Sequence, residues 1–298
     1  MTEVAILTPD PSLAGDAQRW RPAFDRLRDA LALHGIAVSA EPWTNHVNNV
    51  DGLQRYACVL PLLTWGYHYA PAQWLRACAT WQRDAVPFAN PASILAWNTN
   101  KRYLAELGAR GVDVLPTIFT DSPDRTAMDA LHDATGAAEL IMKPTVSAGS
   151  WQTRRLQRGA LIDDVGGVEV ILQPYLPTIE TLGETSLLYF GGRLSHAVNK
   201  RPAAGDFRVQ EEVGGRYTLI DTPPPEAVAL AERTLTAIDA QLLYARIDML
   251  QDSEGRWLLM EAELIEPDFY LDVDPRRGAG FAQALRDMLS TDTKHSDS

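Results

Sequence analysis

Apolar positions in the first part of the chain alternate between strand-like runs and helix-like spacing. Residues 4–7 and 36–40 are short apolar runs, and residues 57–63 are apolar throughout, as in a strand buried on both faces. Between the first two runs, apolar side chains from Trp20 to Leu31 recur at helical spacing, and Gly35 ends this helix. The order predicts a small parallel sheet with helices packed on it.

Further helices are predicted over the next segment. The spacing of apolar residues indicates one helix over residues 74–81 and another over residues 94–107, which ends at Gly108. Ser122-Pro123 is typical of a helix start, because proline is tolerated in the first turn.

After residue 138 the pattern becomes one of strands. Gly191-Gly192 separates two of them and predicts a tight hairpin. A helix is expected over residues 226–240, after prolines that cannot extend it backward, and a closing helix over residues 280–289. The predicted strands are residues 139–143, 168–173, 185–190, 193–199, 243–250 and 257–263.

Composition narrows the class of protein. The 298 residues are 46% hydrophobic, enough for two or three interlocked domains. The net charge of -12 argues against a nucleic-acid or anionic-membrane partner, because no general positive field would attract either. The N-terminus lacks a signal-peptide pattern, no run is long enough to span a membrane, and Cys58 and Cys78 lack metal-site spacing. We therefore expect a cytoplasmic protein with reduced thiols.

Lys143 stands at the end of an apolar strand, before the small and hydroxyl-bearing residues 145–150. A buried ammonium group needs a partner, and a phosphate would be suitable. The backbone N–H groups of such a loop can also bind phosphate oxygens. Taken alone, the pattern equally fits a lysine that extends its stem beside an ordinary turn.

Two further segments suggest a nucleotide. Residues 173–177 form a proline-bounded end to a strand, and Glu180 and Glu184 follow it. The backbone groups of residues 173–177 could bind an adenine edge, and one of the two carboxylates could bind ribose. A solvated proline-rich loop is the alternative. Three cations from Lys200 to Arg208 suit polyphosphate oxygens, because a guanidinium makes two parallel hydrogen bonds, although a solvated basic loop fits as well.

The last predicted hairpin carries charged residues within apolar strands. Residues two apart in a strand share a face, so Arg246 points with Asp248, and Glu261 points with Glu263. Three converging carboxylates repel one another unless a cation lies among them, and their hard oxygens suit magnesium. A solvent-exposed face, with Arg246 paired to an acid, is the alternative.

These elements, in this order, resemble the ATP-grasp superfamily, in the branch of glutathione synthetase, D-alanine–D-alanine ligase and the ribosomal-protein glutamate ligases. The resemblance runs over residues 90–275. It implies an α/β fold, α+β in its C-terminal part, with an N-terminal parallel-sheet domain that precedes the ATP-grasp unit. The expected divisions are residues 1–98 for that domain, 99–176 for a small lid subdomain, 177–290 for a C-terminal subdomain and 291–298 for a disordered tail.

The resemblance also implies roles for individual residues in nucleotide binding and catalysis. Lys101 and Lys143 match the phosphate-binding lysines, and the loop that closes on the triphosphate is matched by Ser147, Gly149 and Ser150. The adenine hinge is matched by Gln173, Pro174, Tyr175 and Leu176, and the ribose-binding acid is matched by Glu180. Lys200 and Arg208 match groups around the phosphates and substrate, Arg246 the arginine that stabilises the anionic intermediate, and Asp248, Glu261 and Glu263 the magnesium ligands.

Two segments differ from the peptide-ligase pattern. Glu263 stands where the third metal ligand is usually asparagine, and a carboxylate can still bind magnesium. Residues 264–267 replace a small, polar segment. Together with residues 64–68, they make the chain look more like the cycloserine-synthetase type, which forms an amide bond within one small amino-acid-derived molecule.

The implied activity is that of a ligase dependent on ATP and Mg2+. A small amino-acid-like carboxylate becomes an acyl phosphate, which an amine then attacks. Two magnesium ions are expected, with Mn2+ as a substitute, and a homodimer is compatible with the helical front domain. Two other functions stay open, a nucleotide-binding regulator without catalysis and a small-molecule kinase. Trp65 and His68 either shape a substrate pocket or belong to ordinary core and loop.

Overall fold

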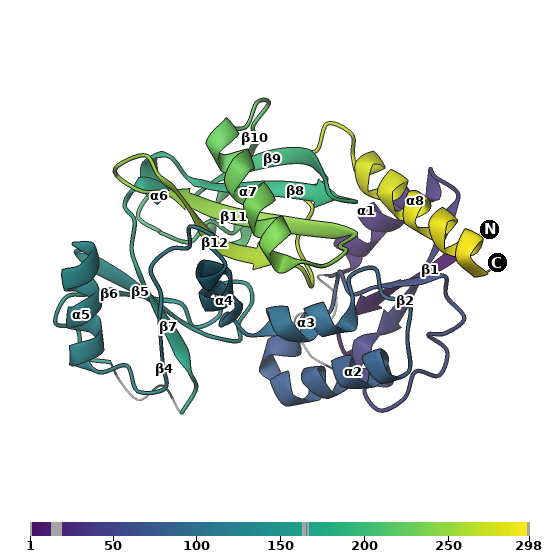
Figure 1. Cartoon of the computed structure of the whole chain (residues 1–298), viewed down its shortest axis with the longest axis horizontal. Coiled ribbons are helices and arrows are strands. Elements are labelled where there is room, and N and C mark those ends of the chain that lie inside the picture. The colour runs from purple at the N-terminus through teal and green to yellow at the C-terminus, as the bar shows by residue number, and fades with distance from the viewer. Residues whose placement is uncertain (1, 13–19, 163–164, 166, 297–298) are drawn as a thin grey trace.

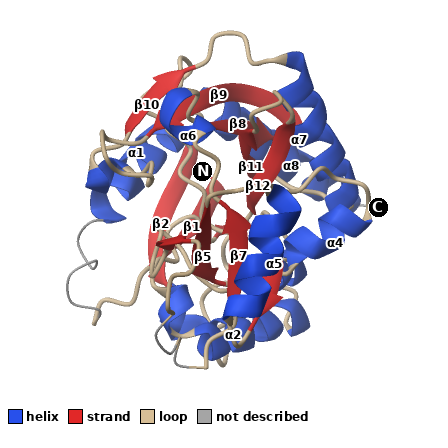
Figure 2. Cartoon of the chain, turned by 90° about the vertical axis from the view of Figure 1, so that its left-hand side faces the viewer, coloured by secondary structure: helices blue, strands red, loops and turns tan. Residues whose placement is uncertain are grey.

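The protein is described here by a computed structural model covering residues 2–12, 20–162, 165 and 167–296. Its strands form three sheets (Figure 1), and in Figure 2 the strands occupy the middle of the molecule with helices outside them. The mixture of one parallel and two antiparallel sheets confirms the predicted fold class. Within the described residues, no helix is long and apolar enough to cross a membrane.

The first sheet is parallel, as predicted, with strand order β2-β1-β3. Side chains of β1 alternate between two cores: Val4 and Ile6 pack with α1, whereas Ala5 and Leu7 pack with Trp74 and other residues of α2. Its strands are β1 (Thr2–Thr8), β2 (Ile36–Pro42) and β3 (Cys58–Leu60), and its helices are α1 (Trp20–Ala32), α2 (Pro71–Arg83) and α3 (Ala92–Thr99), with 3-10 turns at Trp43–His46 and Tyr67–Tyr69.

The second sheet is antiparallel, with strand order β4-β7-β5-β6, and α5 packs on it. Its elements are β4 (Ile118–Thr120), α5 (Arg125–Thr135), β5 (Glu139–Pro144), β6 (Arg154–Gln157) and β7 (Val170–Pro174). The helix start predicted at Ser122-Pro123 is wrong, because α5 begins at Arg125. Asp124 caps the helix instead, because its side chain accepts a hydrogen bond from the backbone N–H of Ala127 at 2.8 Å.

The third sheet is antiparallel, with strand order β10-β9-β8-β11-β12. Gly191 and Gly192 form the predicted hairpin turn, with φ of 55° and 74°, which favours glycine. The elements are α6 (Thr178–Thr181), β8 (Glu184–Phe190), β9 (Arg193–Arg201), a 3-10 turn at Glu211–Val213, β10 (Arg216–Leu219), α7 (Pro225–Ile238), β11 (Tyr244–Gln251), β12 (Trp257–Glu263) and α8 (Ala279–Ser296).

The single helix predicted over residues 94–107 is wrong. The helix α3 ends at Thr99, and α4 begins at Tyr103 and runs to Ala109. Asn100 between them has an extended backbone, and its side chain accepts a hydrogen bond from the backbone N–H of Arg102 at 2.9 Å. The backbone N–H of Lys101 donates to the carbonyl of Thr145 at 2.9 Å. This break in the helix brings Lys101 to the loop that follows β5.

The closing helix α8 joins the first sheet to the third. Phe281 and Leu285 are fully buried in the same core as Val4, Leu31 and Phe190. Figure 1 shows both chain ends on this side of the molecule. Helix α8 continues to Ser296, into the segment expected to be disordered, and the final two residues of that segment lie outside the described chain.

Candidate active site

A cleft of about 640 Å³ is lined by residues from the second and third sheets and by the segment that follows β3. It collects almost all the site residues that the sequence predicted. Those lining it are Lys101, Lys143, Ser147, Gly149, Ser150, Gln173, Pro174, Tyr175, Leu176, Lys200, Arg208, Arg246, Glu261 and Glu263. Glu180 and Asp248 are not among the lining residues.

The charged residues of the last hairpin are neighbours across β11 and β12. Asp248 is the register partner of Glu261, and Arg246 is the register partner of Glu263. Side chains of directly opposed residues in an antiparallel pair project on the same face. The four charged groups therefore gather on one face of the hairpin, as the period-two pattern predicted.

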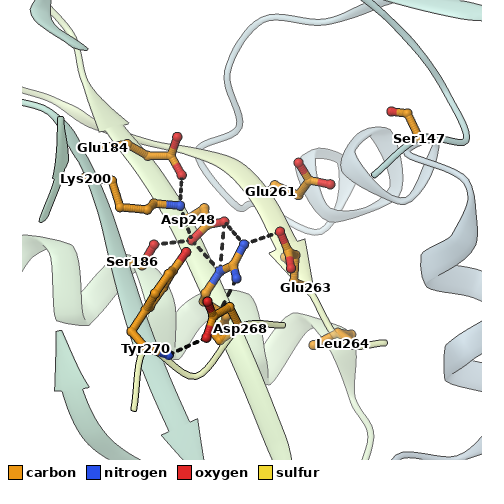
Figure 3. A network of polar contacts seen from close by, with 12 residues as sticks. Ser147, Glu184, Ser186, Lys200, Asp248, Glu261, Glu263, Leu264, Asp268 and Tyr270 are labelled. Carbon is orange, nitrogen blue, oxygen red and sulfur yellow. Dashed lines mark hydrogen bonds and ion pairs between the residues drawn. The ribbon is translucent and has the colours of Figure 1, made fainter. Parts of the chain in front are cut away.

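Asp248 is buried and bound by side chains on three strands. Its carboxylate accepts hydrogen bonds from Arg246 Nε and Nη2, at 3.1 and 3.0 Å, and from the hydroxyl of Ser186, while Lys200 Nζ lies 3.4 Å away (Figure 3). Burial opposes its ionisation, but the charges of Arg246 and Lys200 lower the pKa of Asp248 to about 2. Asp248 is thus an ionised carboxylate neutralised by two cations, Arg246 and Lys200.

A second buried ion pair lies beside it. Lys200 Nζ contacts the carboxylate of Glu184, and the side chains of both residues are at most 5% exposed. Gly183, with φ of 81°, precedes Glu184, and a Cβ there would lie 2.8 Å from the carbonyl oxygen of Lys200. Only glycine lets β8 begin this close to β9. From its sequence, Glu184 was a candidate ribose ligand, and its ion pair with Lys200 was not predicted.

The ring of Tyr270 lies close to the cations Arg246 and Lys200, and the sequence did not predict Tyr270 as a site residue. Its ring centroid lies 5.2 Å from Arg246 Cζ and 5.8 Å from Lys200 Nζ. An aromatic face attracts a nearby cation, so Tyr270 helps to hold both side chains in the cleft wall. The residue follows the last strand and belongs to no charged pattern, so the sequence offered no signal for it.

Glu261 lies between the two lysines expected to bind phosphates. Lys101 Nζ is 3.1 Å from one carboxylate oxygen, and Lys143 Nζ is 3.6 Å from the other. Lys101 also donates to the carbonyl of Ser147 at 2.8 Å. Burial lowers the pKa of Lys143, and the charge of Glu261 partly offsets this. Lys143 therefore has an anionic partner within the protein, Glu261, and its contact with a phosphate stays a prediction.

The carboxylates do not form a closed metal cage. Among the described residues, no three His, Cys, Asp or Glu side chains are grouped to hold a metal ion by themselves. Magnesium usually keeps water and phosphate oxygens among its six ligands, so one or two protein carboxylates suffice. Glu261 and Glu263 line the cleft, with Lys101, Lys143 and Arg246 in contact with their oxygens. Asp248 is not among the lining residues and is bound by Arg246, Lys200 and Ser186. The donor set fits magnesium held jointly with phosphates.

An apolar slot lies next to these charges. Tyr175 packs with Val209 and Leu250, and Ile141, Phe207, Leu176 and Met260 border this cluster. The side chain of Gln173 donates to the hydroxyl of Thr117 at 3.0 Å. Flat apolar walls beside a strand end suit a nucleobase. Glu180 accepts a hydrogen bond from the hydroxyl of Tyr175 at the edge of this slot.

The loop after β5 reaches the N-terminal part of the chain. The ring of Trp151 lies 5.6 Å from that of His68 and 5.5 Å from that of Tyr69. Ser150 and Gln152 have φ of 60° and 54°, so the loop turns tightly on either side of Trp151. His68 and Trp65 both line the cleft, which favours the pocket interpretation over that of an ordinary loop.

The chain is similar to known proteins over most of its length. Residues 4–90 match the family model of the N-terminal domain of D-cycloserine synthetase DcsG. The chain is 29% identical to the cycloserine biosynthesis protein DcsG of Streptomyces lavendulae over 287 residues, covering 88% of this chain and 92% of that protein. It is 27% identical to a glutathione synthetase of Prochlorococcus marinus strain MIT 9313 over 274 residues, covering 86% and 82% of the two chains.

Solved structures show the same fold. The crystal structure of D-cycloserine synthetase DcsG superposes with a TM-score of 0.78 at 28% identity, covering 96% of this chain and 99% of that one. The D-alanine–D-alanine ligase of Bacillus anthracis has a TM-score of 0.72 at 14% identity, with both chains fully covered. Taken together, these similarities support an ATP-grasp superfamily protein, and the chain is similar to D-cycloserine synthetase over nearly its whole length.

Proposed function

We propose that this ligase activates the carboxylate of a small amino-acid-like molecule with ATP and joins it to an amine of the same molecule. The observation that carries the proposal is the meeting of Lys101, Lys143 and Arg246 with Glu261 and Glu263 at one cleft. Such a cleft can hold the phosphates of a nucleotide and the anions of an acyl transfer. The similarity to D-cycloserine synthetase supports the small substrate and the intramolecular bond.

Each charged group has a task in this reaction. ATP supplies the phosphoryl group that converts a carboxylate into an acyl phosphate. Glu261 and Glu263 would hold magnesium, which neutralises phosphate charge. Lys101 and Lys143 then bind phosphate oxygens in place of Glu261.

Arg246 and the loop of residues 147–152 act on the second step. The amine attacks the acyl carbon, an oxyanion forms, and phosphate leaves with its bonding electron pair. Arg246 stabilises the oxyanion from its fixed place beside Asp248. Closure of the loop through Trp151 excludes water, which would otherwise hydrolyse the acyl phosphate.

The test is an incubation with ATP, Mg2+ and a panel of amino acids that carry a second amine. The panel includes both enantiomers of 2-amino-3-aminooxypropanoate, the acid obtained by opening the amide bond of a cycloserine ring. We expect ADP, phosphate and a product lighter than its substrate by one water. A stable phosphorylated product would indicate a kinase instead, and no ADP with any member would contradict the proposal.

The finer parts of the proposal follow from the same site. We place two magnesium ions at the cleft, replaceable by Mn2+, because the cluster offers more than one carboxylate to hard cations. The reaction belongs in the cytoplasm, where ATP is supplied. The domain divisions at residues 98 and 176, and a homodimer, stay predictions.

A further inference from the structure

Glu266 is an acid in the cleft wall that the reaction described above does not use. Its side chain lines the cleft, and its Oε2 atom is buried without a hydrogen-bond partner among the described residues. The neighbouring Glu263 differs, because it accepts a hydrogen bond from Arg246 Nη2. A buried carboxyl oxygen that has lost water and gained no partner costs free energy, so its place in a cleft calls for a ligand.

The backbone just before Glu266 is held by buried side chains from distant segments. The N–H of Leu264 donates to the side chain of Asn98 at 3.0 Å, and the carbonyl of Leu264 accepts from Asn90 at 2.8 Å. The hydroxyl of Tyr244 donates to the carbonyl of Ile265 at 2.9 Å. These groups are buried, and they hold the segment rigidly between the first and third sheets. A rigid, unpaired acid is a preorganised binding group.

The surroundings of Glu266 favour a cationic ligand. Trp65, Tyr67 and Tyr69 line the same cleft, and burial, followed by the nearby Glu266, raises the pKa of Tyr67 well above its ordinary value. Aromatic walls combined with a carboxylate form a pocket that suits an ammonium group. The charge of Arg246 is close enough to act on Glu266, so an anion and a cation of one small molecule can be bound together.

We propose that Glu266 binds the protonated α-amino group of the substrate, while the carboxylate of the same molecule lies on the side of Arg246. This inference rests on the proposed function, and it names the substrate class as free α-amino acids with an unmodified ammonium group. An acid without that group leaves Glu266 unpaired and is rejected. Glu266 is thus a residue that determines specificity.

The experiment measures binding apart from turnover. The probes are 2-amino-3-aminooxypropanoate and 3-aminooxypropanoate, which differ only in the α-amino group. Their affinities are measured by calorimetry with Mg2+ and a non-hydrolysable ATP analogue, for the wild type, Glu266→Gln and Glu266→Asp. The matched control is Asp268→Asn, because Asp268 lines the same cleft and asparagine can still accept the hydrogen bond from the N–H of Tyr270, which is 2.8 Å long.

We expect the wild type and Asp268→Asn to prefer the amino compound by at least about tenfold, as for a charge-assisted hydrogen bond, and Glu266→Gln to lose the preference. An equal preference in wild type and Glu266→Gln, or no binding of the amino compound, overturns the inference. ADP formation is measured separately. If binding depends on Glu266 but no ADP forms, the proposed function is refuted and the inference stands. If ADP forms but binding does not depend on Glu266, the inference is refuted and the proposed function stands. Should Glu266→Gln not fold, Glu266→Asp provides the comparison, with a weakened preference expected.

Discussion

Glu261 lies directly opposite Asp248 in the ladder of β11 and β12, yet the two carboxylates are neutralised by different cations. Arg246 and Lys200 bind Asp248, whereas Lys101 and Lys143 bind Glu261. The first set comes from the third sheet alone. Lys101 and Lys143 come from outside the third sheet and can exchange Glu261 for phosphate. The cluster around Asp248 is therefore permanent, whereas the cluster around Glu261 changes when a ligand binds.

Replacing Lys143 should abolish catalysis without unfolding the protein. In Lys143→Ala, Glu261 keeps Lys101 at 3.1 Å, so the fold is retained. We expect ADP formation to fall by about 100-fold or more, because a preorganised cation is missing from the phosphate site. The measurement is a coupled ADP assay, with circular dichroism to check the fold and the exposed Arg193→Ala as a control. Wild-type turnover in Lys143→Ala would refute its role.

Replacing Glu261 should have opposite effects on magnesium and on nucleotide. Glu261→Gln leaves Lys101 and Lys143 without their acid, so ATP in the absence of magnesium should bind more tightly than to the wild type. The magnesium concentration for half-maximal activity should rise at least about tenfold, since a hard ligand is lost. Nucleotide titrations with and without Mg2+ test both effects. Glu254→Gln, at the exposed turn of the same hairpin, should leave both values unchanged, and an unaltered magnesium requirement in Glu261→Gln would remove that residue from the metal site.

The Glu184–Lys200 pair should stabilise the fold strongly. Lys200→Met would leave the buried carboxylates of Glu184 and Asp248 with one cation fewer. Urea denaturation should show a loss of about 3–5 kcal/mol, the usual cost of leaving a buried charge unpaired. The double variant Glu184→Gln with Lys200→Met should recover part of this loss. Additive losses from the two single substitutions would show that the pair is not coupled.

Trp151 should control access of water to the reaction. Trp151→Ala removes the ring contacts with His68 and Tyr69. We expect more phosphate per molecule of amide product, because an open loop lets water hydrolyse the acyl phosphate. The ratio of phosphate to product, measured by mass spectrometry, tests this, and Trp151→Phe should restore much of the coupling. An unchanged ratio in Trp151→Ala would exclude a sealing role.

Glu266 should make stability depend on pH. Burial and the charge of Glu263 raise the pKa of Glu266 well above its ordinary value of 4.5. The folded state then binds the proton more tightly than the unfolded chain, so its contribution to stability is lost as pH rises above about 4.5. The free energy of unfolding of Glu266→Gln minus that of the wild type should increase over this range. Urea titrations at several pH values measure the difference, and a constant value would contradict the prediction.

The sequence predicted the hairpin charges well because one rule sufficed. Strand residues alternate, so the shared face of Arg246 with Asp248, and of Glu261 with Glu263, followed from the two-residue period. The register that sets Arg246 opposite Glu263 and Asp248 opposite Glu261 came from the structure. The edge strands β4 and β6 were missed, because one has three residues and the other is mostly polar and exposed. Neither carries an alternating apolar pattern.

Other features depend on contacts between distant segments. The break at Asn100 was missed because its flanks have helical spacing, and only the contact between Lys101 and Thr145 accounts for it. The sequence offered no role for Glu266, which follows a segment held by distant residues: Asn90 and Asn98 bond the backbone of Leu264 across 174 and 166 residues. Such side-chain-to-backbone bonds have no period along the chain.

Helix α8 has a consequence for biosynthesis of the protein. Phe281 and Leu285 complete the hydrophobic core around β1 and α1. As a ribosome synthesises the chain, β1 emerges before α8, so the apolar surface that α8 covers stays open until this helix has emerged. The family-matched segment 4–90, expressed alone, would display that surface to solvent and should aggregate unless a peptide carrying α8 is supplied in trans.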